Sequence, residues 1–272
     1  MKKYLVITIK NLSPDQIELA TAILPELGID GMEEQKDSLI AYAESSKVDI
    51  ESVREFLSNN ALNFEIAFAD EENWNATWEA NFEPVFIAGK VQVRAHFHPF
   101  QDGFEHDILI TPKMSFGTGH HATTSMMMQA MMDINFENKQ VIDFGTGTGI
   151  LSILAVQRGA RFVNAIDNDE WSILNVRENI QLNGVEGKID IKMASDLNEM
   201  PISDILLANI NKNVLIEHAS SLFQMLKSGG SLVISGLLTV DYEDIMLVFQ
   251  PYFGLPVREL QEENWIAFVF SK

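Results

Sequence analysis

The segment VIDFGTGTGIL, residues 141–151, joins two apolar runs through three glycines at alternate positions. The first run predicts a buried strand, and the second predicts the start of a helix. Glycines between them allow a tight turn and let a ligand approach the backbone closely. The free N–H groups at the start of the helix lie at the same place. The segment therefore predicts a strand, a ligand-binding loop and a helix in direct succession.

Strands and helices alternate around this segment. The expected strands are continuous apolar runs, as in buried parallel sheets, at 140–144, 162–167, 189–194, 204–210 and 231–235. The expected helices cover 150–158, 170–182, 213–226 and 242–249. Two final strands, 256–260 and 265–271, are separated only by QEEN, which predicts an antiparallel hairpin. The pattern is that of an α/β domain with a doubly wound, mostly parallel sheet.

Residues 1–69 predict a separate, small α+β domain. Strands are expected near 4–9, 38–43 and 63–68, with helices near 14–27 and 49–59. Ser13 and Gln16 predict a capping box at the start of the first helix, and Gly28 predicts its end. Residues 1–83 contain 17 acidic and six basic residues, so the acidity of the chain is concentrated in this part.

Residues 70–84 predict a linker helix. Trp74, Trp78 and Phe82 follow one another at intervals of four and share one helix face, which we expect to pack on the next domain. Pro84 ends this helix, and the second domain then covers residues 85–272.

Composition excludes several kinds of protein. The 272 residues include no cysteine, which rules out disulfides, thiolate metal sites and cysteine nucleophiles. A net charge of −20 argues against phosphate-driven binding of nucleic acid. No signal peptide is visible, and no apolar stretch approaches the roughly 20 residues of a membrane span. We expect a cytoplasmic protein without membrane contact and, since no heptads or exposed apolar helix argue for a dimer, a monomer.

The first glycine loop differs from the common nucleotide-binding motifs. It does not match Gly-x-Gly-x-x-Gly, and no lysine follows it as in triphosphate-binding loops. Asp143 opens the loop, which suits a ligand with a positive centre and no pyrophosphate. The pattern Asp-x-Gly-x-Gly-x-Gly, with Gly145 and Gly147, resembles that of S-adenosylmethionine-dependent methyltransferases. Asp167 ends the next strand, where a carboxylate can accept both ribose hydroxyls; alternatively it caps a helix.

Two later polar residues are further candidates for the site. Asp196 follows the strand at 189–194 and either accepts a hydrogen bond from the adenine amine or is a solvated loop acid. Asn209 ends the strand at 204–210 and either caps the next helix or offers its carbonyl to a substrate amine. We expect Asn209 to be the catalytic residue that orients the amine.

SFGTGHHATT, residues 115–124, is a second glycine loop. We expect Phe116, Gly117 and Thr118 to cover the cofactor and exclude water. His120 and His121 are adjacent, so their side chains diverge, and no carboxylate accompanies them at ligand spacing. No metal site is therefore predicted.

The helix expected after this loop begins at Thr123 or Thr124, either of which can cap it. Five methionines follow, at 126, 127, 128, 131 and 132. Methionine adapts to irregular gaps, so we expect core packing rather than a substrate groove.

Nearly the whole chain resembles the ribosomal protein L11 methyltransferase family, known as PrmA. The resemblance covers the N-terminal α+β domain, the Trp-x-x-x-Trp-x-x-x-Phe-x-Pro linker, the FGTG loop, DFGTGTGIL, AIDND, LLANI and SGLL. The FGTG loop is the most diagnostic part, because generic methyltransferases lack it. The resemblance implies a class I methyltransferase fold and S-adenosylmethionine as cofactor, held by Thr124, Gly145, Asp167 and Asn209. It also implies methylation of lysine and N-terminal amines on a basic ribosomal protein, L11, which the N-terminal domain recognises.

The chain departs from the family pattern at a few positions. His120 replaces threonine and Ala122 replaces proline after the FGTG loop. Thr146 and Thr148 stand where the family often has cysteine and serine, and residues 211–215 replace Leu-Ala-Gly-Pro-Leu. The cofactor motifs remain intact.

Two other function classes remain open. One is a methyltransferase for a different amine, on a small molecule or a nucleic-acid base; the absence of an Asn-Pro-Pro-aromatic motif and the acidic charge argue against bases. The other is a non-catalytic, cofactor-binding module in ribosome assembly, against which the intact glycine and acid motifs argue. A dehydrogenase is a remote third alternative.

Overall fold

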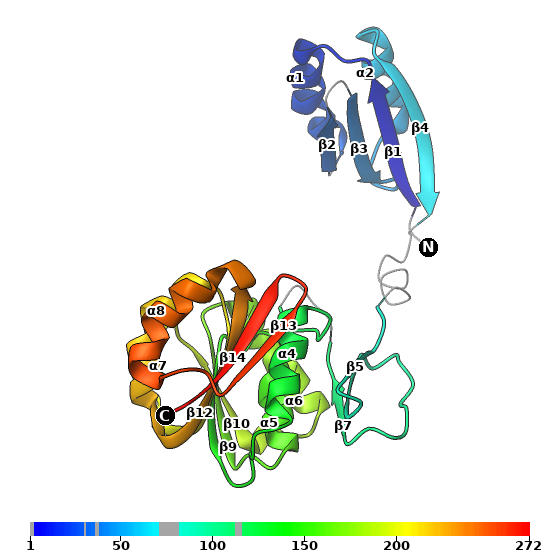
Figure 1. Cartoon of the computed structure of the whole chain (residues 1–272). Helices are drawn as coiled ribbons and strands as arrows, with labels where there is room; N and C mark the ends of the chain where they lie inside the picture. The colour runs from blue at the N-terminus through cyan, green and yellow to red at the C-terminus, as the bar shows by residue number, and fades with distance from the viewer. Residues whose placement is uncertain (1–2, 30, 36–37, 71–81, 112–115) are drawn as a thin grey trace. The chain divides into compact units, whose positions relative to one another are not determined.

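The computed structural model describes the chain except for residues 1–2, 30, 36–37, 71–81 and 112–115 (Figure 1). Contacts divide the chain into two compact units, Met1–Phe82 and Glu83–Lys272. The expected linker helix, with Trp74 and Trp78, falls on residues 71–81 and so lies outside the described residues.

The N-terminal unit is a four-stranded antiparallel sheet with two helices. Its elements are β1 (Lys3–Lys10), α1 (Pro14–Ile23), β2 (Gly31–Gln35), β3 (Ser38–Glu44), α2 (Ile50–Asn59) and β4 (Asn63–Asp70), and the strand order is β2-β3-β1-β4. The capping box of Ser13 and Gln16 is confirmed, and Gly28 ends a 3-10 turn that follows α1. Strand β2 was not predicted, because its sequence GMEEQ is polar and lacks apolar alternation.

The second unit begins with a small three-stranded sheet that the sequence analysis did not predict. It contains β5 (Val85–Ile87), β6 (Val91–Arg94) and β7 (His106–Leu109), in the order β5-β6-β7. Strands of three or four residues are too short to show a periodic pattern.

A seven-stranded sheet forms the centre of the second unit, in the order β10-β9-β8-β11-β12-β14-β13. Its strands are β8 (Gln140–Phe144), β9 (Phe162–Asp167), β10 (Ile189–Met193), β11 (Ser203–Asn209), β12 (Leu226–Leu238), β13 (Arg258–Glu262) and β14 (Trp265–Ser271). Neighbours from β10 to β12 are parallel, whereas β14 is antiparallel to both β12 and β13. The doubly wound sheet with its terminal hairpin is therefore confirmed.

Helices cover both faces of this sheet (Figure 1). One face carries α4 (Ala122–Met131), α5 (Ile150–Gln157) and α6 (Glu170–Leu182), and the other carries α7 (Lys212–Met225) and α8 (Tyr242–Phe253). Because the chain runs outward from β8 in one half and from β11 in the other, the strand order reverses between these two strands. Such a reversal opens a crevice at the carboxyl ends of the strands.

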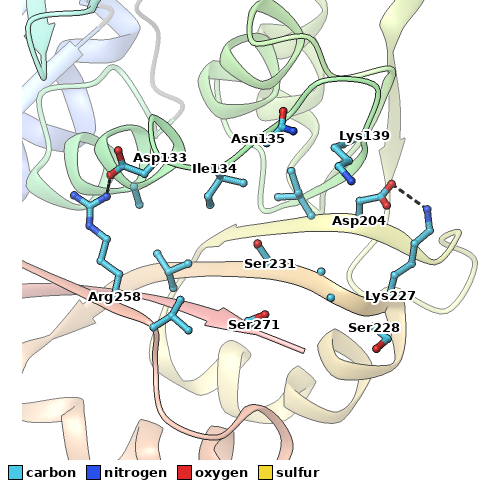
Figure 2. A pocket seen from close by; sticks show the side chains of 16 residues that line it. Asp133, Ile134, Asn135, Lys139, Asp204, Lys227, Ser228, Ser231, Arg258 and Ser271 are labelled. Carbon is cyan, nitrogen blue, oxygen red and sulfur yellow. Dashed lines mark hydrogen bonds and ion pairs between the residues drawn. The ribbon is translucent and has the colours of Figure 1, made fainter.

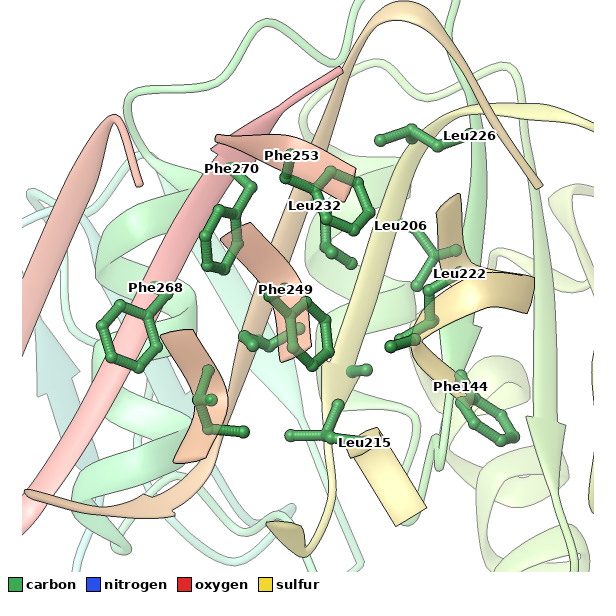
Figure 3. Packing of buried hydrophobic residues seen from close by; sticks show 14 of the residues in the cluster. Phe144, Leu206, Leu215, Leu222, Leu226, Leu232, Phe249, Phe253, Phe268 and Phe270 are labelled. Atoms are coloured by element: carbon green, nitrogen blue, oxygen red, sulfur yellow. The ribbon is translucent and has the colours of Figure 1, made fainter. Parts of the chain in front are cut away.

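The core between the sheet and α7–α8 is rich in phenylalanine and leucine (Figure 3). Phe249 and Phe253 on α8 lie with their ring centroids 5.8 and 5.6 Å from that of Phe270 on β14. On the opposite face, the methionines of α4 at 126, 127, 128 and 131 are almost completely buried, which confirms their role in packing. Among the described residues, no helix is long and apolar enough to cross a membrane.

Candidate active site

The loop Gly145–Gly149, called the glycine loop below, connects β8 to α5. All three of its glycines have positive φ values, 78°, 54° and 81°. A Cβ atom on Gly147 would collide with the carbonyl oxygen of Phe116, and one on Gly145 would collide with the side chain of Ile210. Glycine is thus required both by the backbone angles and by the close approach of two other segments.

A cavity of about 290 Å3 lies against the glycine loop at the carboxyl ends of the central strands. Five of the predicted site residues line it: Phe116, Gly145, Gly147, Asp167 and Asn209. The other lining residues are Phe144, Asn168, Ser172, Ala194, Ser195, Ile210, Asn211 and Val214. The structure therefore brings together segments that are up to 98 residues apart in the sequence.

Asp167 stands at the end of β9 and is bonded to backbone groups on two sides. The N–H of Gly147 donates to its Oδ2 at 2.8 Å, and the N–H of Asp169 donates to its Oδ1 at 3.0 Å. Asp169, rather than Asp167, caps α6. A carboxylate can accept about four hydrogen bonds, so Asp167 retains capacity for two ligand hydroxyls.

Asp143 lies beneath the glycine loop and does not line the cavity. Its side chain is fully buried, and its Oδ2 accepts hydrogen bonds from Thr146 Oγ1 and Ser152 Oγ, both at 2.7 Å. Its Oδ1 is buried without a hydrogen-bond partner among the described residues. Burial raises the pKa of Asp143 to about 6, although the two hydroxyl donors act in the opposite direction.

Asn209 ends β11, and its side chain is held by a neighbour on α4. Its Nδ2 donates to Thr124 Oγ1 at 3.3 Å. Its Oδ1 is buried and has no partner within the described part of the chain. Thr124 is fully buried and does not line the cavity, so its observed contact is with Asn209. Leaving an amide oxygen buried and unpaired costs free energy. Asn209 Oδ1 is therefore a candidate acceptor for a ligand N–H group.

The FGTG loop, Phe116–Gly119, lies directly on the glycine loop. The N–H of Thr148 donates to Phe116 O at 3.0 Å, and its Oγ1 donates to Gly117 O at 2.5 Å. The Thr118 hydroxyl lies 3.1 Å from His120 Nδ1. These bonds join the two glycine-containing loops along one side of the cavity.

The cap of α4 corrects one prediction. The N-cap is His121, whose ring accepts from the N–H of Thr123, and neither Thr123 nor Thr124 takes that position. The His121 ring also packs edge-on against Phe116 and Trp265, with centroids 5.2 and 4.6 Å apart. The three rings pack in succession, and that of Phe116 lines the cavity.

Asp196 lies outside this cavity. It lines a neighbouring depression, which shares Ala194 with the cavity, and its Oδ1 accepts the N–H of Asn198. Among the described residues, no three histidine, aspartate or glutamate side chains gather in a way that could hold a metal ion.

Comparison with known proteins gives a consistent result. The family model for ribosomal protein L11 methyltransferase (PrmA) matches residues 8–272. The chain belongs to this family. A ribosomal protein L11 methyltransferase of Porphyromonas gingivalis is 37% identical over 95% of this chain and 93% of its own length, and one of Bacteroides fragilis is 36% identical over 93% of each chain. A crystal structure of ribosomal protein L11 methylase from Lactobacillus delbrueckii superposes with a TM-score of 0.66, at 25% identity, over 70% of this chain and 99% of that one.

This chain is thus a methyltransferase of class I fold with S-adenosylmethionine as its methyl donor. The residues present fit that cofactor: the glycine loop leaves no room for side chains, and Asp167 has capacity for hydroxyl groups. When bound, the cofactor supplies an electrophilic methyl group on a sulfonium centre.

A second, larger cavity of about 590 Å3 lies at the other end of the strands of the seven-stranded sheet (Figure 2). It lies where the strands begin, near Lys139, Asp204 and Lys227. Four of its five charged groups form two pairs: Lys227 lies 2.9 Å from Asp204, and Arg258 contacts Asp133. No sequence motif of the methyltransferase falls there, so the smaller cavity is the candidate active site.

The sequence analysis missed several residues that shape the active site. Asn168 directly follows Asp167, Ser172 lies five residues after it, and Ile210 and Asn211 follow Asn209, so proximity to a motif was a usable signal. Asn179, which donates to the glycine loop at Thr148 O, was also missed, although the spacing of four residues between Asn175, Asn179 and Asn183 was visible.

Proposed function

We propose that this methyltransferase transfers methyl groups to lysine and N-terminal amines of ribosomal protein L11, and that Asn209 Oδ1 orients the amine. The buried, unpaired Oδ1 of Asn209 is the observation that carries this proposal. The family model and the names of the relatives support L11 as the substrate.

Asn209 can act as an acceptor because its amide is already fixed. Thr124 takes the Nδ2 hydrogen bond, and this leaves Oδ1 to accept an N–H from the amine. An amine held this way presents its lone pair in a defined direction. Correct positioning alone can lower a barrier by roughly 7–11 kcal/mol, so a strong base is not required.

The amine must also lose its proton before it reacts. A free lysine has a pKa of about 10.4, so reaching the neutral form at pH 7 costs on the order of 4–5 kcal/mol. Desolvation favours the neutral amine and reduces this cost. The ring of Phe116, with those of His121 and Trp265 packed in succession against it, provides aromatic surface at the cavity for this purpose.

We assign the remaining cofactor contacts as follows. Asp167 accepts the ribose hydroxyls, Gly145 and Gly147 allow close approach of the backbone, and Phe116, Gly117 and Thr118 cover the cofactor. Thr124 contributes through Asn209, Asp143 supports the glycine loop from below, and Asp196 borders the adenine end. The common support is their position in or beside one cavity.

We also propose that residues 1–69 recognise the protein substrate, and that 70–84 link them to the methyltransferase domain. The excess of acidic residues before Glu83 suits a basic ribosomal protein. With a net charge of −20, direct contact with nucleic acid is not expected, and we propose a cytoplasmic monomer.

A transfer assay tests this function. The protein is mixed with methyl-labelled S-adenosylmethionine and with ribosomal proteins from a strain that lacks the activity, and the products are analysed by mass. We expect label on L11 alone, in steps of one methyl group at amines. Label on RNA or on small molecules, with none on protein, would reject the substrate, and the absence of any transfer would favour a non-catalytic module.

A further inference from the structure

Helix α6 and its C-cap carry three asparagines at intervals of four residues: Asn175 and Asn179 within the helix, and Asn183 at the cap. Their side chains bond to the backbone of residues 109–111, which continue directly from β7 toward the FGTG loop. Asn183 exchanges two hydrogen bonds with Leu109: the Leu109 N–H donates to its Oδ1 at 3.0 Å, and its Nδ2 donates to Leu109 O at 2.6 Å. The Thr111 N–H donates to Asn179 Oδ1 at 2.8 Å, and Asn175 Nδ2 donates to Thr111 O at 3.2 Å.

Asn175, Asn179 and Asn183, called the asparagine ladder below, bond to residues 109–111 in the way that a neighbouring strand would. Four residues of a helix advance about 6 Å, and two residues of an extended chain advance about 6.6 Å, so the two repeats nearly coincide. Ile110, between the two bonded residues, donates its N–H in the other direction, to Arg94 O at 2.9 Å. Residues 109–111 are therefore bonded on both sides.

Asn179 differs from the other two asparagines because it also reaches the glycine loop. Its Nδ2 donates to Thr148 O at 2.8 Å, and the side chain is completely buried. Thr148 in turn donates its N–H and its hydroxyl to Phe116 and Gly117. One buried amide thus connects the chain that leads into the FGTG loop with the glycine loop on which that loop rests.

We propose that Asn179 is a positioning residue for the cofactor site, because it fixes the glycine loop relative to residues 109–111. Asn179 touches neither the cavity nor the reacting atoms, so it acts through Thr148. This proposal rests on the proposed function only through the binding of S-adenosylmethionine in the cavity, and not through the choice of methyl acceptor.

Asn179→Leu, which keeps the approximate size of the side chain, tests this role. We expect S-adenosylhomocysteine to bind roughly ten-fold or more weakly by calorimetry, because the Thr148 carbonyl loses its only side-chain donor among the described residues. Asn183→Leu is the matched control: it removes two hydrogen bonds to the same segment and one to the Asn179 carbonyl, but among the described residues Asn183 makes no hydrogen bond to the glycine loop. Its thermal stability should fall, while its affinity for S-adenosylhomocysteine should stay within about two-fold of wild type.

Unchanged affinity in a folded Asn179→Leu variant, or equal weakening in both variants, would overturn the proposal. Amide hydrogen exchange of the unmodified protein gives a second test that does not depend on folding of a variant. S-adenosylhomocysteine should slow exchange at Thr111 more than at Ile108 in β7; an equal change at both would also overturn it. Both readouts are taken without protein substrate, so they are separate from the choice of methyl acceptor.

Discussion

The sharpest prediction at the scale of single residues concerns the Asn209 side chain. Asn209→Ala removes the acceptor, so we expect kcat to fall about 100-fold, similar to the loss of one oriented hydrogen-bonding group in other active sites. Asn209→Asp keeps an acceptor oxygen and should retain more activity than the alanine variant. Initial rates of methyl transfer at saturating cofactor measure both. Activity of Asn209→Ala within about three-fold of wild type would contradict the role that we assign.

Asp143 predicts a pH dependence of stability. Its pKa in the folded state is raised to about 6, so between roughly pH 4 and pH 6 the folded protein holds a proton that the unfolded chain has lost. Stability from this group is complete below pH 4 and is lost as the pH rises through 6. In Asp143→Asn this loss is absent.

Urea unfolding of the cofactor-free protein checks this prediction. The free energy of unfolding of Asp143→Asn, relative to wild type, should increase by roughly 2–3 kcal/mol between pH 4 and pH 7. Parallel pH profiles for the two proteins would show that the folded-state pKa of Asp143 is ordinary.

These two residues also show what could be predicted from the sequence at this scale. The sequence predicted Asn209 as an end-of-strand acceptor, and its Oδ1 has no hydrogen-bond partner among the described residues. Asp143 was expected to contact the cofactor, but its carboxylate turns to Thr146 and Ser152 under the loop. A motif gives residue types and order, whereas the direction of a side chain depends on packing that a single segment does not contain.

At the scale of elements, a prediction for the glycine loop separates backbone strain from a clash with a neighbouring segment. Gly147→Ala forces a side chain into the left-handed region and against the Phe116 carbonyl. Gly184→Ala imposes the same kind of backbone angle, φ 64°, but its Cβ would meet nothing within 4 Å. Both should lose about 1–2 kcal/mol of stability from the backbone alone.

Only Gly147→Ala should also weaken S-adenosylhomocysteine binding, by roughly ten-fold or more, because the FGTG loop must move away. Calorimetry on the two variants measures the difference. Equal affinities would mean that the contact between the loops does not shape the cofactor site.

The elements that the sequence predicted carry a local signal, an apolar run or a helix cap, which the missed elements lack. Strands such as β8 and β11 contain apolar runs, and helix α6 has its cap at Asp169. Strand β2 is polar, and β5, β6 and β7 are short, so they depend on partners distant in sequence. The asparagine ladder was missed for a related reason: its bonding partner at 109–111 is more than 60 residues away.

The acidic N-terminal unit makes a prediction for the whole molecule. KM for ribosomal protein L11 should rise several-fold between about 50 and 300 mM NaCl, since screening weakens the attraction to a basic substrate. KM for S-adenosylmethionine should change little. Glu51→Gln with Glu55→Gln, two exposed acids on α2, should reduce this salt dependence.

Glu186→Gln with Asp190→Asn makes an equal charge change on the exposed surface of the methyltransferase domain and serves as the control. A salt response that both double variants share would assign the effect to net charge rather than to the N-terminal unit. A KM for L11 that is independent of salt would remove the electrostatic argument for substrate recognition.

The reversal of strand order between β8 and β11 has a further consequence. The cavity takes Asp167, Asn168 and Ser172 from the half of the sheet built around β9, and Asn209, Ile210 and Asn211 from the half that begins with β11. With the roles proposed above, donor recognition and acceptor recognition are encoded in two separate stretches of the chain. Mutations can alter which amine is accepted without disturbing how the donor is held, so descendants of one such ancestor can acquire new substrates while inheriting the same chemistry.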